Sequence, residues 1–220
     1  MSIRNAVAEA LATFLFVFAI IAAINNSGDF APLAIGFALL VLVFATGHMS
    51  GGHINPAISF GAYLRGALGL ADLVAYVIAQ LVGGALGAVL AGVLFARPAA
   101  PLEVEMGPAF LVKALFTFVL VYVVLNTATS KDHTGNSFYG LAIGTTVFVG
   151  ASTVGSISGG SFNPAVALGL AVGGNFAWSA LWMYFLAPLV GAALAAIAFG
   201  ALNKEDKLVR PTTKSTKIAR

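Results

Sequence analysis

Six apolar segments, each about long enough to cross a membrane, dominate this sequence and restrict its possible folds. A helix rises about 1.5 Å per residue, so it needs about 20 apolar residues to cross the hydrocarbon core of a bilayer. The segments cover roughly residues 5–24, 32–48, 71–95, 109–128, 139–155 and 176–201. Only 9% of the residues are charged, whereas soluble domains average about 25%. We therefore expect an all-α membrane protein with six transmembrane helices in contact with lipid.

Two shorter apolar segments interrupt this series, one in each half of the chain. They cover about residues 55–66 and 163–172, and each begins with Asn-Pro-Ala. Each is about half a membrane span in length, yet it is too apolar for an ordinary loop. The sequence predicts that both are re-entrant half-helices.

The two halves of the chain also share sequence. Residues 50–57 (Ser-Gly-Gly-His-Ile-Asn-Pro-Ala) match residues 158–165 (Ser-Gly-Gly-Ser-Phe-Asn-Pro-Ala) at an offset of 108 (163 minus 55). Each copy holds three full spans, and because three is an odd number, the second copy enters the membrane from the opposite side. The expected units are one domain at 1–202, with inverted repeats at 1–95 and 109–201, and a disordered basic cytoplasmic tail at 203–220.

The basic residues give this bundle an orientation. With both termini in the cytoplasm, Arg4, Arg65, Lys131 and the basic tail lie inside, and the outer loops keep one basic residue, Arg97. Basic loops favour the cytoplasmic side of a membrane. We expect a multi-pass protein of the cell membrane, inner or plasma, with both termini in the cytoplasm.

The doubled Asn-Pro-Ala motif carries the most specific chemistry. Asn55 and Asn163 are favoured N-cap residues, and Pro56 and Pro164 suit the first helical position. Inverted symmetry brings the two helix N-termini together near the membrane centre, each carrying about half a positive charge. Such a pair orients a passing dipole and repels cations and protons. A single Asn-Pro is more simply a helix start in a loop, but two copies in matching contexts favour a pore. The central motif is therefore expected to consist of Asn55, Pro56, Ala57, Asn163, Pro164 and Ala165.

The residues before each Asn are candidates for a line of carbonyl acceptors along the pore. Glycine pairs in both copies permit irregular backbone at membrane depth, where polar groups must be paired or face water. The alternative is that the glycines serve only tight turning. The predicted carbonyl-lining residues are Gly51, Gly52, His53, Ile54, Gly159, Gly160, Ser161 and Phe162.

Residues 47–57, the second Asn-Pro-Ala motif and Ala8-Glu9-Ala10 resemble the aquaporin/aquaglyceroporin (major intrinsic protein) family. The resemblance covers nearly the whole chain except the tail. It implies six spans, two re-entrant half-helices, a pore through each protomer for water and small neutral solutes, and a homotetramer in membrane lipid.

The narrowest part of the pore departs from the family pattern. Most members have Arg directly after the second Asn-Pro-Ala, where this chain has Val166. Carried over by spacing, the other filter residues are Ile35, Ala151 and Gly160. Because these four residues include no aromatic ring, imidazole or guanidinium, we expect a wide, apolar filter, unless Arg97 folds back over the mouth.

This filter suggests a range of solutes. Glycerol-like polyols, urea, hydrogen peroxide and neutral metalloids such as arsenite are expected to pass with water. A bacterial arsenic-resistance branch of the family similarly lacks the Arg, which is an analogy only. A mainly water-conducting channel is the first alternative, and a structural membrane-contact protein is an alternative of another class.

Three further residues are candidates for support of the loops. Glu9 is expected to accept hydrogen bonds from the first re-entrant loop, because intramembrane charge is functional by default. Lys113 occupies the matching place, where the family usually has a second Glu; it either donates to loop carbonyls, pairs with an acid or extends toward the interface. His48 is expected to brace the first loop, or else to gate the pore by protonation.

Other function classes find little support in the composition. The absence of cysteine excludes disulfides and thiolate metal sites, and His48 and His53 lack a third ligand, so we expect no metal and no cofactor. No acid–base or nucleophile–base pair is evident, so we do not expect an enzyme. A proton-coupled transporter that uses Glu9 and Lys113 stays conceivable. The net charge of +3 is too small to indicate nucleic-acid binding.

Overall fold

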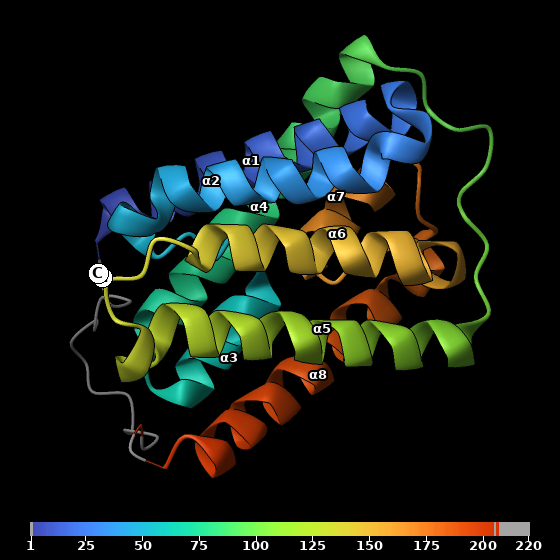
Figure 1. Cartoon of the computed structure of the whole chain (residues 1–220). Helices are drawn as coiled ribbons and strands as arrows, with labels where there is room; N and C mark the ends of the chain where they lie inside the picture. The colour runs from blue at the N-terminus through green and yellow to red at the C-terminus, as the bar shows by residue number, and fades with distance from the viewer. Residues whose placement is uncertain (1, 205, 207–220) are drawn as a thin grey trace.

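The computed structural model describes residues 2–204 and 206, and these form a bundle of long helices that enclose two short ones (Figure 1). The six long helices are α1 (Ile3–Asn26), α2 (Ala31–Ser50), α4 (Leu70–Leu94), α5 (Met106–Thr129), α6 (Tyr139–Ser158) and α8 (Leu181–Leu202). The short helices are α3 (Pro56–Arg65) and α7 (Pro164–Val172). Single 3-10 turns, η1 (Gly28–Phe30), η2 (Lys131–His133) and η3 (Trp178–Ala180), lie in the connections. The predicted fold class is confirmed, because the described part of the chain has six helices long and apolar enough to span a membrane.

Both halves of the chain have the same order of elements, two long helices, one short helix and a third long helix. Within the halves, α1 packs against α4 and α5 packs against α8, while α2 and α6 meet between the halves. The short helices cross this boundary, because α3 packs against α8 and α7 packs against α4. In Figure 1, α3 lies in the left part of the bundle, and α7 lies to the right of it. Each half therefore completes its core with a half-helix of the other.

Glycines at matching positions allow the closest helix pairs in both halves. A Cβ atom on Gly83 of α4 would overlap the carbonyl oxygen of Ala10 on α1, and one on Gly191 of α8 would overlap that of Ala114 on α5. Small residues at such crossings let two backbones approach within membranes. These glycines therefore pack helices within one protomer.

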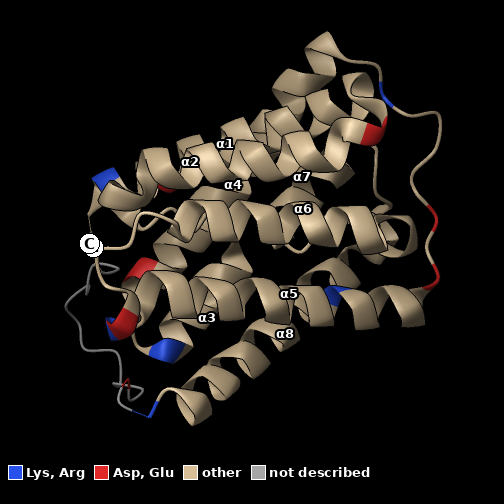
Figure 2. Ribbon diagram, viewed as in Figure 1, with Lys and Arg blue, Asp and Glu red and all other residues tan. Residues whose placement is uncertain are grey.

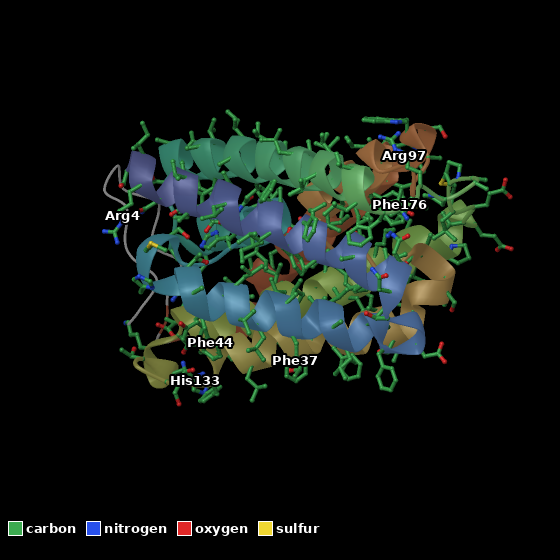
Figure 3. The ribbon with its side chains drawn as sticks, turned by 90° about the horizontal axis from the view of Figure 1, so that it is seen from above. Arg4, Phe37, Phe44, Arg97, His133 and Phe176 are labelled. Atoms are coloured by element: carbon green, nitrogen blue, oxygen red, sulfur yellow. The ribbon has the colours of Figure 1, made fainter. Side chains whose placement is uncertain are left out.

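The outer surface of the bundle suits a lipid environment. Large apolar side chains such as Phe37 and Val41 are about half exposed on α2, and exposed apolar side chains occur on all six long helices. Most charged residues lie at the two ends of the bundle and in the loops (Figure 2). Arg4 and His133 lie at one end, and Arg97 and Phe176 lie at the other (Figure 3). The predicted disordered tail, 203–220, falls mainly outside the described residues.

Candidate functional site

The two Asn-Pro-Ala motifs begin the two short helices. Asn55 has extended backbone, and its Oδ1 accepts a hydrogen bond of 2.8 Å from the N–H of Ala57. Asn163 caps α7 in the same way, through a hydrogen bond of 2.9 Å from the N–H of Ala165. Proline follows each cap at the start of the helix, where its missing N–H has no intrahelical partner to lose. Each asparagine amide nitrogen stays free to bond elsewhere.

These amide nitrogens join the two motifs to each other. Asn55 Nδ2 donates to the carbonyl of Phe162 over 3.0 Å, and Asn163 Nδ2 donates to the carbonyl of Ile54 over 2.8 Å. Each asparagine therefore binds the residue that precedes the other. The arrangement holds the positive ends of α3 and α7 together inside the protein, with both asparagines at most 6% exposed.

Glu9 anchors the segment before α3, residues 51–55, which we call loop one. Its carboxylate accepts hydrogen bonds from the backbone N–H groups of His53 (3.0 Å) and Ile54 (2.6 Å). It also accepts from Ser50 Oγ (2.6 Å) and from Gln80 Nε2 (2.8 Å). Glu9 is fully buried, and four donors around one carboxylate compensate the loss of water that burial imposes.

Lys113 anchors the matching segment before α7, residues 159–163, which we call loop two. Its Nζ donates to the carbonyl oxygens of Ser158 (2.6 Å) and Ser161 (3.1 Å). It also lies 3.7 Å from the ring centroid of Tyr184, a cation–π geometry. The side chain is fully buried, so it does not extend toward the interface, and among the three roles left open above it takes that of donor to carbonyls.

Sequence reasoning missed three residues of these anchors. Tyr76 and Tyr184 donate to the carbonyls of Ser50 (2.8 Å) and Ser158 (3.3 Å), which end α2 and α6. Gln80 is fully buried and donates to Glu9. The tyrosines are separated by the offset of 108 that relates the motifs (184 minus 76), so extending the repeat comparison into the third span finds them. A polar Gln within an apolar span was a second available signal.

A narrow cavity of about 30 Å³ lies beside both asparagines. Three of the four predicted filter residues, Ile35, Gly160 and Val166, line it. Ala151 does not line the cavity but lies behind Gly160, with its Cα 3.3 Å from the position that a Cβ on Gly160 would take. The remaining wall is formed mainly by apolar side chains, those of Phe16, Ile20, Leu39, Leu120 and Val147 on the long helices and that of Ile58 on α3. The polar groups of the site therefore face an otherwise apolar passage.

The predicted carbonyl-lining residues divide into two groups. His53, Gly160, Ser161 and Phe162 line the cavity. The others, Gly51, Gly52, Ile54 and Gly159, are not among its lining residues. Carbonyls in both loops are already engaged, because Lys113 and the asparagine amides bind three of them.

The remaining candidates lie away from this cavity. His48 is exposed in the last turn of α2, and its ring makes no hydrogen bond to another residue in the described part of the chain, so it has no bracing contact there. The guanidinium of Arg97 lies near Gly92 of α4, at the end of the bundle opposite Arg4 (Figure 3). It therefore does not fold over the filter.

Comparisons with known proteins agree with this architecture. The profile of the major intrinsic protein family matches residues 1–199. The chain is 38% identical to the glycerol uptake facilitator protein-like 6 of Lactiplantibacillus plantarum, over 92% of this chain and 100% of that protein. It is 35% identical to nodulin-26 of Glycine max, over 97% of this chain and 83% of that protein. The aquaglyceroporin of Plasmodium falciparum superposes with a TM-score of 0.79 at 21% identity, covering 91% of this chain and 96% of that one.

Proposed function

The chain belongs to the major intrinsic protein family, whose members are membrane channels for water or small solutes such as glycerol, and from this premise we propose what its own pore admits. We propose a passive channel for small uncharged solutes larger than water, namely glycerol-like polyols, urea, hydrogen peroxide and neutral metalloids such as arsenite. Water passes by the same route.

The observation that carries this proposal is the pairing of Asn55 and Asn163 beside a cavity whose filter has no charged side chain. The asparagine pair supplies hydrogen-bond donors and two helix N-termini, which favour neutral dipoles over cations. Val166 and Ile35 supply apolar surface where a guanidinium would narrow the passage. The carbon atoms of a solute such as glycerol can contact this apolar wall, so the filter discriminates little against solutes larger than water.

A stopped-flow panel on proteoliposomes tests the proposal. Light scattering reports the flux of water, glycerol, urea and peroxide, and arsenite uptake is measured directly. We expect glycerol to permeate well above empty vesicles. Water flux without glycerol or urea flux indicates a water channel, and no flux above empty vesicles for any solute contradicts a channel role.

Val166→Arg tests the filter assignment. The longer, charged side chain should lower glycerol flux at least about tenfold relative to water, because a narrowed polar site rejects the larger solute. Val166→Leu, which adds bulk without charge, is the matched control and should have a smaller effect on the same ratio. Equal loss of water and glycerol flux in Val166→Arg contradicts the assignment.

We further propose a homotetramer in the cell membrane with both termini in the cytoplasm. The apolar outer surface of the long helices supports burial in lipid and against neighbouring copies. Native mass spectrometry in detergent tests the tetramer. Protease access to the C-terminal tail in right-side-out and inverted vesicles tests the orientation.

A further inference from the structure

Phe162 contributes an aromatic side chain of loop two to the wall of the cavity beside the asparagines. Its counterpart in loop one is Ile54, 108 residues earlier (162 minus 54). Ile54 is fully buried, and it is not among the residues that line the cavity. Its φ of 54° is not shared by Phe162. The two loops therefore match in their backbone bonds to the asparagines but differ in which side chain reaches the passage.

The ring of Phe162 is held from two sides. It stacks on the ring of Phe116 of α5, with the centroids 5.5 Å apart and the planes at 25°. It also lies against the backbone of α6, because a Cβ atom on Gly150 would come within 2.5 Å of Phe162 Cε2. The backbone of Phe162 is fixed as well, since its carbonyl accepts the hydrogen bond from Asn55. The cavity is therefore the open side toward which a displaced ring can move.

The passage has little room at this ring. The cavity of about 30 Å³ holds about one or two water molecules, so a solute of glycerol size passes only if side chains around it yield. Filter residues offer little resistance, because Gly160 has no side chain and Val166 is a small aliphatic residue. A ring packed between a helix backbone and a second ring yields less, since packed side chains have few alternative positions. The stiffest part of this wall is therefore Phe162.

We propose that Phe162 is a specificity-determining residue whose ring limits the size of the solute that passes the asparagine pair. Gly150 of α6 sets the width of the passage indirectly, because it leaves the space into which this ring is withdrawn. The inference rests on the proposed channel function, and it moves size selection from the filter to the residue before the second Asn-Pro-Ala.

Polyols of increasing length test the width of the passage. The flux of water, glycerol, erythritol and ribitol is measured by light scattering on proteoliposomes of purified protein. The wild type should pass glycerol well and ribitol poorly. Phe162→Ala should raise the ratio of ribitol to glycerol flux roughly tenfold or more, because a pocket larger by several carbon atoms no longer rejects the longer chain. Val166→Ala, which widens the filter instead, should raise the same ratio less.

Gly150→Ala tests the opposite change. The added methyl group overlaps the ring, which has to move toward the cavity, so we expect the ratio of glycerol to water flux to fall roughly tenfold. Gly155→Ala makes the same substitution on the same helix, where a Cβ meets no atom within 4 Å, and it should match the wild type.

A double-mutant cycle separates a displaced ring from a damaged fold. Leucine lacks Cε2 and Cζ, the two ring atoms that a Cβ on Gly150 would meet. In the Phe162→Leu background, Gly150→Ala should therefore change the ratio of glycerol to water flux less than about twofold, a strong departure from additivity. If Gly150→Ala lowers the ratio equally in both backgrounds, the ring is not the cause and the inference is wrong.

The outcomes for this inference and for the channel function differ. A wild type that passes glycerol and ribitol equally, or a Phe162→Ala variant with the wild-type ratio, overturns the inference and leaves the channel function standing. Should Phe162→Ala not elute as a folded species in detergent, Phe162→Leu from the cycle gives the same comparison with a smaller expected rise. A wild type that passes no neutral solute overturns both.

Discussion

Loop one and loop two reach the same end point by opposite means. Both place an asparagine at the start of a half-helix, and both follow a helix that ends in glycine of positive φ, 96° at Gly51 and 76° at Gly159. Yet the anchor of loop one is an acid that binds backbone N–H groups, whereas the anchor of loop two is a base that binds backbone carbonyls. The geometry of the asparagine pair therefore does not require identical anchors.

The surroundings of the two anchors also differ between the halves. Gln80 donates to Glu9, and at the matching position of α8, 108 residues later, the chain has Pro188, which has no side-chain donor. Ser59, which accepts from Gln80, is matched by Ala167. An acid needs neighbouring donors and a lysine does not, so the polar cluster exists only in the first half.

The backbones of the loops differ as well. Ile54 has φ of 54°, the left-handed region, and it is the one non-glycine residue of positive φ within the described part of the chain. Its counterpart, Phe162, does not share this conformation. The N–H of Ile54 binds Glu9 over 2.6 Å, so the acid holds the strained residue in place. Lys113 binds carbonyls, so loop two does not need a residue of positive φ at the position of Phe162.

The largest expected effect follows from removing the anchor of loop one. Glu9→Leu leaves the N–H groups of His53 and Ile54 buried without their partner, and it also removes one of the two acceptors of Gln80 Nε2. We expect a loss of about 3–5 kcal/mol in the free energy of unfolding. Unfolding in mixed micelles measures it. Glu9→Gln, which keeps an acceptor oxygen, should lose less, and equal losses in the two variants would contradict the network.

Reversing the charge of the anchor of loop two should have the next largest effect on the free energy of unfolding. Lys113→Glu places a carboxylate against the carbonyls of Ser158 and Ser161, and we expect a loss of about 3 kcal/mol. Adding Pro188→Gln supplies the donor that Glu9 has in the first half, and it should restore about 1 kcal/mol. A double-mutant cycle on unfolding free energies measures this coupling. Additive effects would show that the anchor and its neighbour act independently.

Two glycines sharpen the comparison further. Gly52 and Gly160 have φ of 63° and 64°, and a Cβ on either meets atoms at 3.2–3.3 Å. Replacing either by Ala should cost about 1–2 kcal/mol of unfolding free energy. Only Gly160 lines the cavity, so Gly160→Ala alone should lower glycerol flux per folded protein. A similar loss of flux in Gly52→Ala would place that glycine in the passage too.

The smallest effect concerns the ends of the half-helices. α3 ends in Arg65, which lies 3.3 Å from Asp206, whereas α7 ends at Val172 beside Gly173 and has no such cation. Burial alone raises the pKa of the Asp206 carboxyl, but hydrogen bonds from Ser130 and Lys131 and the charge of Arg65 lower it from its ordinary value of 3.8. The ionised Asp206 carboxylate therefore stabilises the fold above about pH 4, and this contribution is lost as the pH falls through its lowered pKa.

Asp206→Asn tests this contact. At pH 7 we expect it to cost about 1 kcal/mol, because the ion pair with Arg65, whose partners are only 10% and 4% exposed, is lost while the amide keeps the shape and one acceptor oxygen of the carboxylate. The difference from the wild type should vanish in strong acid. Thermal unfolding between pH 3 and pH 7 measures both, and a difference that grows in acid would contradict the sign.

The sequence predicted the fold well because the signals for it are local. Six apolar runs and two half-length segments each reveal themselves without any partner, and the Asn-Pro pairs mark where the half-helices begin. The anchors are different, because their partners lie far away in the chain. Lys113 binds oxygens of residues 45 and 48 positions away, and no local pattern distinguished this from an amine at the interface. Tyr76, Tyr184 and Gln80 also bind partners far away in the chain, so only the repeat offset and the polarity of Gln80 could have indicated them from the sequence.

The reciprocal bonds between the asparagines have a consequence for biogenesis. Asn55 leaves the ribosome 108 residues before Asn163 (163 minus 55), a delay of roughly 5–20 s at ordinary rates of translation. During that interval the amide of Asn55 and the carbonyl of Ile54 have no native partner, since both wait for the second motif. The nascent first half must therefore be sheltered from lipid by the insertion machinery, or by water held in the unfinished pore, until the second half arrives.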